Sequence, residues 1–290
     1  MRNLDLDALQ IFKAVADHGG VARAAVHLNR VQSNVSTRLK QLEATLEAPL
    51  FRRQNRRLVL SEQGRVLLSY ADRLLRLSAE AQAAVRDGAP QGLLRIGTME
   101  STAAARLPPI LAAYHAAWPQ VRIELVTGTS GALAAKVRNY EIEAAFVAQP
   151  FEAQGLAQQP AFDEELALIS PLAWPEIHGP KDVGDRSVIA FAAGCSYRRI
   201  LEAWFGQEGV APDKVMEFAS YHAIVACVAA GSGVAIVPRS VLALLGAEPS
   251  LRVTPLSGKH GRAQTRLVWR ADDETPALQA LQQLLAQRRQ

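Results

Sequence analysis

Residues 21–46 read VARAAVHLNRVQSNVSTRLKQLEATL, and this stretch decides the fold of the first third of the chain. Its early apolar residues have the spacing of a short amphipathic helix: Val21, Ala24, Ala25 and Leu28. After the break Leu28-Asn29-Arg30, a second apolar stripe predicts a longer helix: Val35, Leu39, Leu42 and Leu46. Asn29 and Gln32 have the spacing of an N-cap and its N3 partner, which predicts a sharp start for this helix. Two helices joined by a three-residue turn are typical of the helix-turn-helix, whose second helix enters the DNA major groove.

The flanking residues extend this pattern in both directions. An earlier helix is predicted from an apolar stripe that ends at Gly19-Gly20: Leu6, Leu9, Phe12 and Val15. Residues 51–60 resemble two short strands around a basic tip, and Ser61 is expected to cap a long amphipathic helix that reaches about Asp87. That helix would be about 40 Å long and has no partner in its own small domain. We therefore expect it to pair with a second copy of itself.

The polar side chains of this region are suited to DNA. Gln and Arg form bidentate hydrogen bonds with adenine and guanine edges, whereas Ser and Thr suit phosphates or bases. Arginines at the hairpin would straddle phosphates of the DNA backbone, as the wing of a winged helix-turn-helix does. Nine Lys and Arg stand against three Glu between Arg23 and Arg65, which disfavours a merely solvated face. The candidate DNA-binding residues are Arg23, Arg30, Gln32, Ser33, Asn34, Ser36, Thr37, Arg38, Lys40, Arg52, Arg53, Arg56 and Arg57.

Length and charge separate the chain into a basic part and a neutral part. The 290 residues are typical of two domains, and 49% of them are hydrophobic. Residues 1–90 hold 14 Lys and Arg against 9 Asp and Glu, whereas residues 91–290 hold 18 against 19. The excess positive charge therefore lies in the first third, which predicts a small domain that binds a polyanion.

We expect a cytoplasmic, nucleoid-associated protein that does not enter the membrane. The N-terminus is acidic and lacks the apolar core of a secretory signal. The longest apolar run is eight residues, Ala223 to Ala230, which is far short of a membrane span. The two cysteines, Cys195 and Cys227, lie in apolar surroundings and are expected to be reduced.

From Leu93 onward, predicted strands and helices alternate, which favours parallel sheets with crossover helices. A helix is expected from about Ala103 to Trp118. The strand candidates are 93–97, 121–126, 144–148, 166–170, 188–190, 215–218, 234–237 and 266–269. Eight strand candidates in about 200 residues fit two small α/β lobes better than a single sheet.

A spaced pattern of residues runs from the second helix of this region to the start of the long helix: Ala22, Ala24, Ala25, Leu28, Gln32, Val35, Ser36, Leu39, Leu42, Glu43, Leu46, Leu50, Phe51, Arg53, Leu60, Ser61 and Gly64. This pattern resembles the N-terminal signature of LysR-type transcriptional regulators. Two departures are visible: Gly20-Val21 stands where an aromatic residue is usual, and Val31 and Ser33 replace a common Ser and Pro around Gln32. We expect these to alter the preferred DNA half-site rather than DNA binding itself.

The resemblance implies a fold of the α plus α/β class. A winged helix-turn-helix (1–60) would be followed by a linker and dimerisation helix with its hinge (61–91). Residues 92–290 would form a two-lobed effector domain similar to periplasmic binding proteins. Lobe I would span about 92–163 and 266–290, and lobe II about 164–265. Such regulators act as dimers of dimers on promoter DNA, so the implied partners are double-stranded promoter DNA, further copies of the chain in a homotetramer, a small-molecule effector and RNA polymerase. No cofactor or metal is implied.

The effector cleft is expected on the turns that follow strands, where open α/β sheets bind ligands and helix N-termini favour anions. In the family, the equivalents of Thr98, Ser101, Thr129 and Ser196 line the cleft and often hold a carboxylate. An acidic side chain such as Glu100 is unusual in a cleft that binds a carboxylate ligand. Its presence suggests a cationic or zwitterionic effector. The full set of candidates is Thr98, Glu100, Ser101, Thr102, Thr129, Ser130, Phe146, Gly194, Cys195, Ser196, Ser220 and His222.

No catalytic constellation can be assembled from the sequence, so we do not expect an enzyme. The six histidines contain no His-x-x-x-His pair, and no nucleophile elbow or phosphate-binding Gly-Lys-Ser/Thr loop is present. Two alternatives stay open: a redox-responsive regulator that uses Cys195 and Cys227, and a solute-binding protein without catalysis. The basic first third disfavours the latter.

Overall fold

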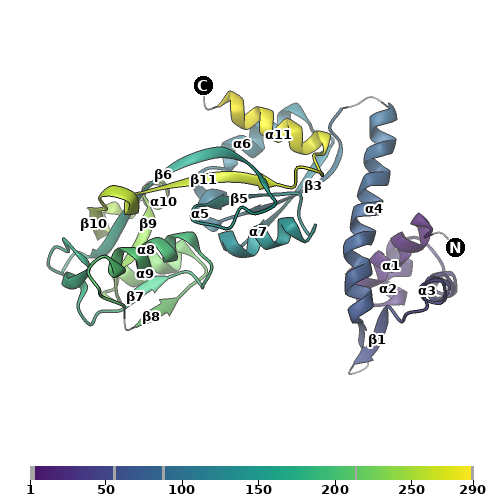
Figure 1. Ribbon diagram of the computed structural model, residues 1–290, viewed down its shortest axis with the longest axis horizontal. Coiled ribbons are helices and arrows are strands. Elements are labelled where there is room, and N and C mark those ends of the chain that lie inside the picture. The colour runs from purple at the N-terminus through teal and green to yellow at the C-terminus, as the bar shows by residue number, and fades with distance from the viewer. Residues whose placement is uncertain (1–3, 55–56, 87–88, 213, 289–290) are drawn as a thin grey trace. The chain divides into compact units, whose positions relative to one another are not determined.

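The computed structural model describes residues 4–54, 57–86, 89–212 and 214–288. Its chain divides into two compact units, Met1–Ala89 and Pro90–Gln290 (Figure 1). The described part of the first unit contains α1 (Leu6–His18), α2 (Val21–His27), α3 (Gln32–Leu46), β1 (Phe51–Gln54), β2 (Arg57–Leu60) and α4 (Glu62–Arg86). Its core gathers apolar side chains from the helices and the hairpin, among them Leu9, Phe12, Val35, Leu39 and Leu50.

The start of α3 differs from the sequence-based prediction. The helix begins at Gln32 with Val31 as its N-cap residue, and no side chain caps it. Asn29 instead adopts a left-handed conformation with a φ of 51°. In that conformation it ends α2, because the Arg30 N–H then donates to the Ala25 carbonyl. Asn tolerates this backbone better than most residues, so its role is to end one helix rather than to begin the next.

The beginning of α4 is fixed as predicted by Ser61. Its Oγ accepts a hydrogen bond of 2.9 Å from the Gly64 N–H and donates one of 2.6 Å to the Pro49 carbonyl. Gly64 itself is required by close packing, since a Cβ atom at this position would lie 2.1 Å from the Leu50 carbonyl oxygen. The backbone of α4 at Gly64 is therefore packed directly against the backbone at Leu50, just before the hairpin.

The second unit is built on a mixed sheet. Its described strands are β3 (Gly92–Thr98), β4 (Val121–Thr127), β5 (Ala144–Ala148), β6 (Ala157–Pro171), β7 (Val188–Ala190), β8 (Val215–Glu217), β9 (Ala235–Pro238), β10 (Leu251–Pro255) and β11 (Arg262–Trp269). Its described α-helices are α5 (Glu100–Ala105), α6 (Pro108–Ala117), α7 (Ser130–Arg138), α8 (Ser196–Gly206), α9 (Tyr221–Ala229), α10 (Arg239–Leu245) and α11 (Pro276–Gln287). Short 3₁₀ turns lie at Pro180–Val183, Glu248–Ser250 and Gly258–His260.

The prediction of separate parallel sheets is wrong in part. The order β10-β6-β11-β5-β3-β4, with β9 also paired to β6, gives one seven-stranded sheet through both lobes. Only β3 with β4, β3 with β5, and β7 with β8 pair in parallel among the described strands. Strand β11 runs antiparallel to β5 and β6 because the chain passes from one lobe to the other within β6 and returns within β11.

The prediction of one helix over about 103–118 is also wrong, because two helices cover this range. Strand β3 leads into α5, which ends at Ala105, and α6 begins at Pro108 with a second proline beside it. Proline lacks an N–H and its ring clashes with the preceding turn, so it begins a helix readily and interrupts one.

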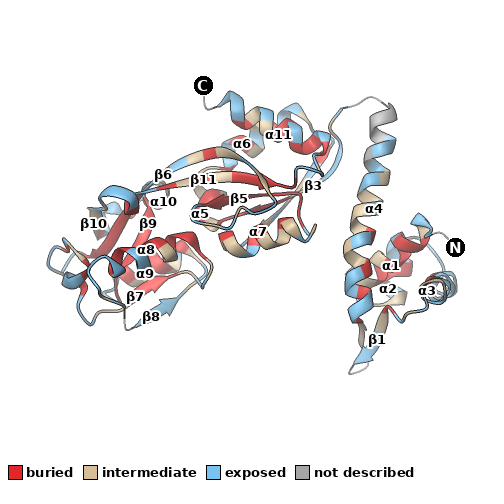
Figure 2. Cartoon of the chain, in the orientation of Figure 1, coloured by how far each residue is buried: buried red, intermediate tan, exposed pale blue. Residues whose placement is uncertain are grey.

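Strand β5 is buried along its length (Figure 2), and its alternating side chains belong to two separate cores. Ala144 and Phe146 pack with α6 and α11, and Ala145 and Val147 belong to the larger core that continues into lobe II. Successive side chains of a strand point to opposite faces, so one short strand separates the two cores.

Candidate DNA interface and effector cleft

One face of α3 is buried and the other is polar. Val35, Leu39 and Leu42 are buried, and the side chains between them point outward. Ser36 is half-buried. Five polar side chains are exposed and have no hydrogen-bond or ion-pair partner in the described part of the chain: Gln32, Ser33, Asn34, Thr37 and Lys40.

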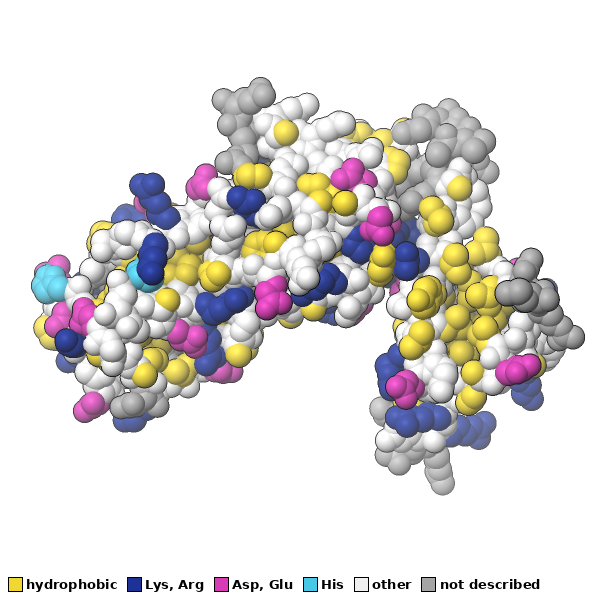
Figure 3. All heavy atoms as spheres, viewed as in Figure 1, with side chains coloured by type: hydrophobic (Ala, Val, Ile, Leu, Met, Phe, Trp, Pro, Cys, Tyr) yellow, Lys and Arg dark blue, Asp and Glu magenta, His cyan; other side chains and the backbone are white. Residues whose placement is uncertain are grey.

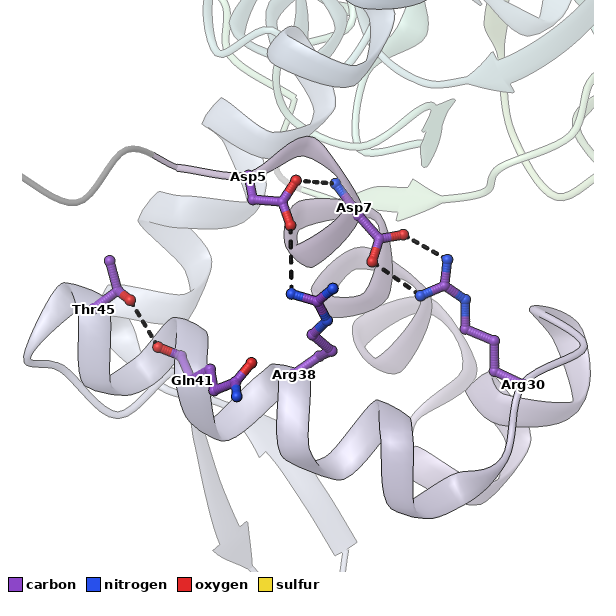
Figure 4. A network of polar contacts seen from close by, with 6 residues as sticks. All are labelled: Asp5, Asp7, Arg30, Arg38, Gln41 and Thr45. Atoms are coloured by element: carbon purple, nitrogen blue, oxygen red, sulfur yellow. Dashed lines mark hydrogen bonds and ion pairs between the residues drawn. The ribbon is translucent and has the colours of Figure 1, made fainter.

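Three of the predicted DNA-binding arginines are engaged within the protein, and Figure 4 shows two of them, Arg30 and Arg38. Arg30 donates two hydrogen bonds to Asp7, of 2.9 and 2.5 Å, and this contact lowers the pKa of the Asp7 carboxyl. Arg38 lies 3.8 Å from the carboxylate of Asp5. Arg23 donates to the Gly19 carbonyl at 3.0 Å. The Arg30 and Arg38 contacts connect the start of α1 to the turn before α3 and to α3 itself.

The hairpin carries its arginines outward. Arg52 and Arg53 on β1 are exposed and are paired in register with Val59 and Leu58. Glu43 of α3 anchors the base of the hairpin by accepting hydrogen bonds from the Leu50 and Phe51 N–H groups, at 2.8 and 3.4 Å. Basic side chains gather around this end of the first unit (Figure 3). Arg57 begins β2, and Arg56 lies outside the described residues.

A cleft in the second unit lies where three strands end. It is lined by Met99, Glu100, Ser101, Gly128, Thr129, Ser130, Phe191, Cys195, Tyr197 and Tyr221. Strands β3, β4 and β7 each end one residue before a lining residue, which is Met99, Gly128 and Phe191 respectively. Ligand sites are expected at such carboxyl ends of strands. Its cavity of about 20 Å³ is little more than one ordered water requires.

Backbone and hydroxyl contacts hold the lobes together beside the cleft. The Gly131 N–H donates to the Gly194 carbonyl at 3.3 Å. The Ser196 hydroxyl donates to the carbonyls of Ala148 and Pro150, at 2.6 and 3.0 Å. Gly194 has a φ of 92°, and a Cβ atom there would lie 3.1 Å from Thr129 Oγ1. The loop before α8 therefore approaches α7 at backbone distance.

Seven predicted effector residues do not line this cleft. Phe146 points to the opposite face of the sheet, where its ring stacks on that of Phe162 with the ring centroids 5.9 Å apart. Thr98 and Thr102 are buried beneath the turn, and Ser196 is occupied by its two carbonyl acceptors. Gly194 contributes the lobe contact, Ser220 is half-buried before α9, and His222 is exposed.

Five lining residues were missed by sequence reasoning: Met99, Gly128, Phe191, Tyr197 and Tyr221. The candidates were chosen because the turns after strands are rich in Ser and Thr, whereas three of the missed residues are aromatic: Phe191, Tyr197 and Tyr221. Their positions after β7 and at the starts of α8 and α9 carried the same strand-end signal.

Glu100 is the acidic group of the cleft. The pKa of its carboxyl is raised, because the effect of burial outweighs the lowering effects of the Tyr221 N–H and the His222 side chain. Its Oε2 atom is buried and accepts no hydrogen bond within the described residues. The cleft thus contains a carboxylate oxygen without a donor.

Cys195 and Cys227 are free thiols, and Cys195 lies in the cleft. Burial raises the pKa of the Cys195 thiol, which reduces its thiolate fraction and disfavours the redox alternative. Among the described residues, no group of three or more His, Cys, Asp or Glu could hold a metal ion. No helix within the described ranges is long and apolar enough to cross a membrane.

Comparisons with known proteins agree with this arrangement. The family model described as "Bacterial regulatory helix-turn-helix protein, lysR family" matches residues 6–65, and "LysR substrate binding domain" matches residues 87–290. The chain is 39% identical over 279 residues to the HTH-type transcriptional regulator GltR of Bacillus subtilis, covering 96% of this chain and 94% of that protein. It is 37% identical to the regulator SoxR of Arthrobacter, over 93% and 92% of the two chains.

Solved structures share the fold. A full-length OxyR variant from Pseudomonas aeruginosa superposes with a TM-score of 0.76 at 22% identity, covering 99% of this chain and 95% of that one. CbnR in complex with its target DNA gives a TM-score of 0.70 at 21% identity, over 98% and 99%. The named relatives are transcriptional regulators rather than enzymes. The chain belongs to the LysR family and is a DNA-binding transcriptional regulator with an effector-binding domain.

Proposed function

We propose that α3 reads base edges in the major groove and that the β1–β2 hairpin contacts phosphates as a wing. The five exposed polar side chains of α3 that have no partner in the described chain, Gln32, Ser33, Asn34, Thr37 and Lys40, carry this proposal. Base contacts are assigned to Gln32, Ser33, Asn34, Ser36, Thr37 and Lys40, and phosphate contacts to Arg52, Arg53, Arg56 and Arg57. Arg23, Arg30 and Arg38 already have partners within the protein, so their role on the DNA is to add positive charge near its backbone. Arg30 and Arg38 also hold α3 against the start of α1.

We infer that α4 pairs with a second copy of the chain. Its apolar side chains Val66, Tyr70, Leu74 and Leu77 are 37 to 62% exposed and are spaced along one helix face. Hydrophobic side chains gather over α4 (Figure 3). A pair of such dimers would form the homotetramer, which places several α3 helices along one promoter. The assembled tetramer on the nucleoid would be the form that contacts RNA polymerase.

The cleft between the lobes is proposed as the effector site. An effector larger than one water molecule requires the lobes to separate or rearrange, which breaks or changes the Gly131–Gly194 contact. The resulting lobe geometry would alter the spacing between dimers and hence the bend in the promoter DNA. The boundaries 1–60, 61–91 and 92–290 are proposed for the three functional parts, with the lobes dividing inside β6 and β11.

Fluorescence anisotropy of the full chain on its own upstream intergenic DNA, with scrambled DNA as competitor, tests the proposal. We expect binding that prefers the native sequence and weakens steeply as salt rises. Binding without sequence preference would contradict base reading by α3.

A further inference from the structure

The cleft contains one acidic side chain whose hydrogen-bonding capacity is not satisfied. Glu100 is the first residue of α5, and its Oε2 atom is buried without a donor among the described residues. A buried acceptor without a partner is costly, and more so when it is charged. A bound group with N–H donors and positive charge would remove that cost.

The other walls of the cleft suit a cation. Phe191 and Tyr221 lie with their ring centroids 4.8 Å apart at an angle of 58°, and both line the cleft with Tyr197. Aromatic faces attract ammonium groups, and a desolvated site strengthens that attraction. The same rings and Met99 provide apolar surface for an alkyl chain.

No lysine or arginine of the described residues lines the cleft to balance Glu100, and the His222 side chain, which acts on its carboxyl, is exposed. Arg198, which follows the lining residue Tyr197, is turned to Glu202 at 2.9 Å and also pairs with Glu217. A ligand that offers only a carboxylate would therefore approach an acidic group with no lysine or arginine to receive it.

We propose that the effector of this regulator is a small organic ammonium compound, whose cationic group is held by the Glu100 carboxylate against the rings of Phe191 and Tyr221; this rests on the cleft being the effector site. A carboxylate carried by the same molecule has a place at the N-termini of α7 and α8, whose N-cap residues Thr129 and Cys195 line the cleft. The class thus includes amines and amino acids and excludes simple carboxylates.

Calorimetric titration of the full-length protein with propylamine, putrescine, L-alanine and propionate tests this assignment. We expect at least one of the three ammonium probes to bind and propionate not to bind. Glu100→Gln keeps the shape of the side chain and removes its charge, so it should weaken ammonium binding about 10- to 100-fold. Glu152→Gln, at an exposed position outside the cleft, should leave binding unchanged.

Propionate binding, ammonium binding that is equal in Glu100→Gln and the parent, or no binding by any ammonium probe would each overturn the assignment. Melting curves of both variants without ligand show whether the fold is retained. Anisotropy on the upstream DNA, measured with the same preparations, separates this outcome from failure of the proposed function. Sequence-specific DNA binding together with failed ammonium binding overturns the effector class alone.

Discussion

Arg30 and Asp7 join the turn before α3 to the first turn of α1 through two parallel hydrogen bonds, of 2.9 and 2.5 Å. Asp7 lies near the N-terminus of α1, and its neighbour Asp5 caps that helix and faces Arg38 on α3. The orientation of α3 is therefore set by charged contacts at the surface as well as by the buried Val35 and Leu39.

The Arg30 contact predicts a pH-dependent stability. Because Arg30 lowers the pKa of the Asp7 carboxyl below its ordinary 3.8, the contact stabilises the fold above that pH. The contribution is lost as the pH falls through the lowered pKa. Asp7→Asn should therefore melt at a slightly lower temperature than the parent near neutral pH, and the two melting temperatures should converge as the pH falls below 3.8 and through the lowered pKa. An equal difference at all pH values would show that the charge of Asp7 does not matter. Asp185→Asn, at an exposed position in the second unit, provides the control.

The wing predicts a change in salt dependence. Replacing both Arg52 and Arg53 by Ala should weaken binding to native and scrambled DNA alike. The slope of log affinity against log salt should become shallower by roughly two if each arginine contacts one phosphate. Arg122→Ala removes an exposed arginine from the second unit and should not change the slope. Anisotropy titrations at several salt concentrations provide both readings, and an unaltered slope in the double variant would remove the wing from the DNA interface.

The exposed stripe of α4 predicts the oligomeric state. A charge at Leu77, which is 62% exposed, should disrupt pairing of two α4 helices, so Leu77→Glu should dissociate in analytical ultracentrifugation at concentrations where the parent stays associated. Ala79→Glu places the same charge on the opposite side of the helix and should leave association intact. Equal behaviour of the two variants would show that this stripe is not the interface.

Gly64 predicts a large cost from one methyl group. A Cβ atom 2.1 Å from the Leu50 carbonyl oxygen forces the backbone apart, so Gly64→Ala should lower the free energy of unfolding of the first unit by about 2 kcal/mol or more. Gly206, within α8, has no atom within 4 Å of an added Cβ, and Gly206→Ala should not destabilise the protein. Denaturant titration measures both. A small cost at Gly64 would mean that the hairpin and α4 are not packed this closely.

The sequence was sufficient for the features that depend on local periodicity. The apolar stripes of α1, α2 and α3 and the cap at Ser61 lie where predicted, because each is determined by residues three or four positions apart. The start of α3 was misassigned because Asn29 has two uses, as an N-cap and as a left-handed residue that ends a helix.

Features that depend on distant residues were predicted less well. The antiparallel course of β11 follows from its pairing with β6, about a hundred residues earlier, and no local pattern encodes it. Cleft residues with hydroxyl groups, such as Ser101 and Thr129, were found through their turns. Tyr197 and Tyr221 were not found, since an apolar ring at a helix start is consistent with either a core or a ligand site.

The ratio of affinities for native and scrambled upstream DNA, measured for the parent and for Gln32→Ala, tests the central claim most directly. Gln32 is the exposed first residue of α3 and is assigned to a base edge. We predict that Gln32→Ala lowers affinity for the native sequence by about 1–3 kcal/mol while affinity for scrambled DNA barely changes, so that the ratio falls. A uniform loss on both DNAs, with the ratio unchanged, would contradict the account in which α3 reads the sequence.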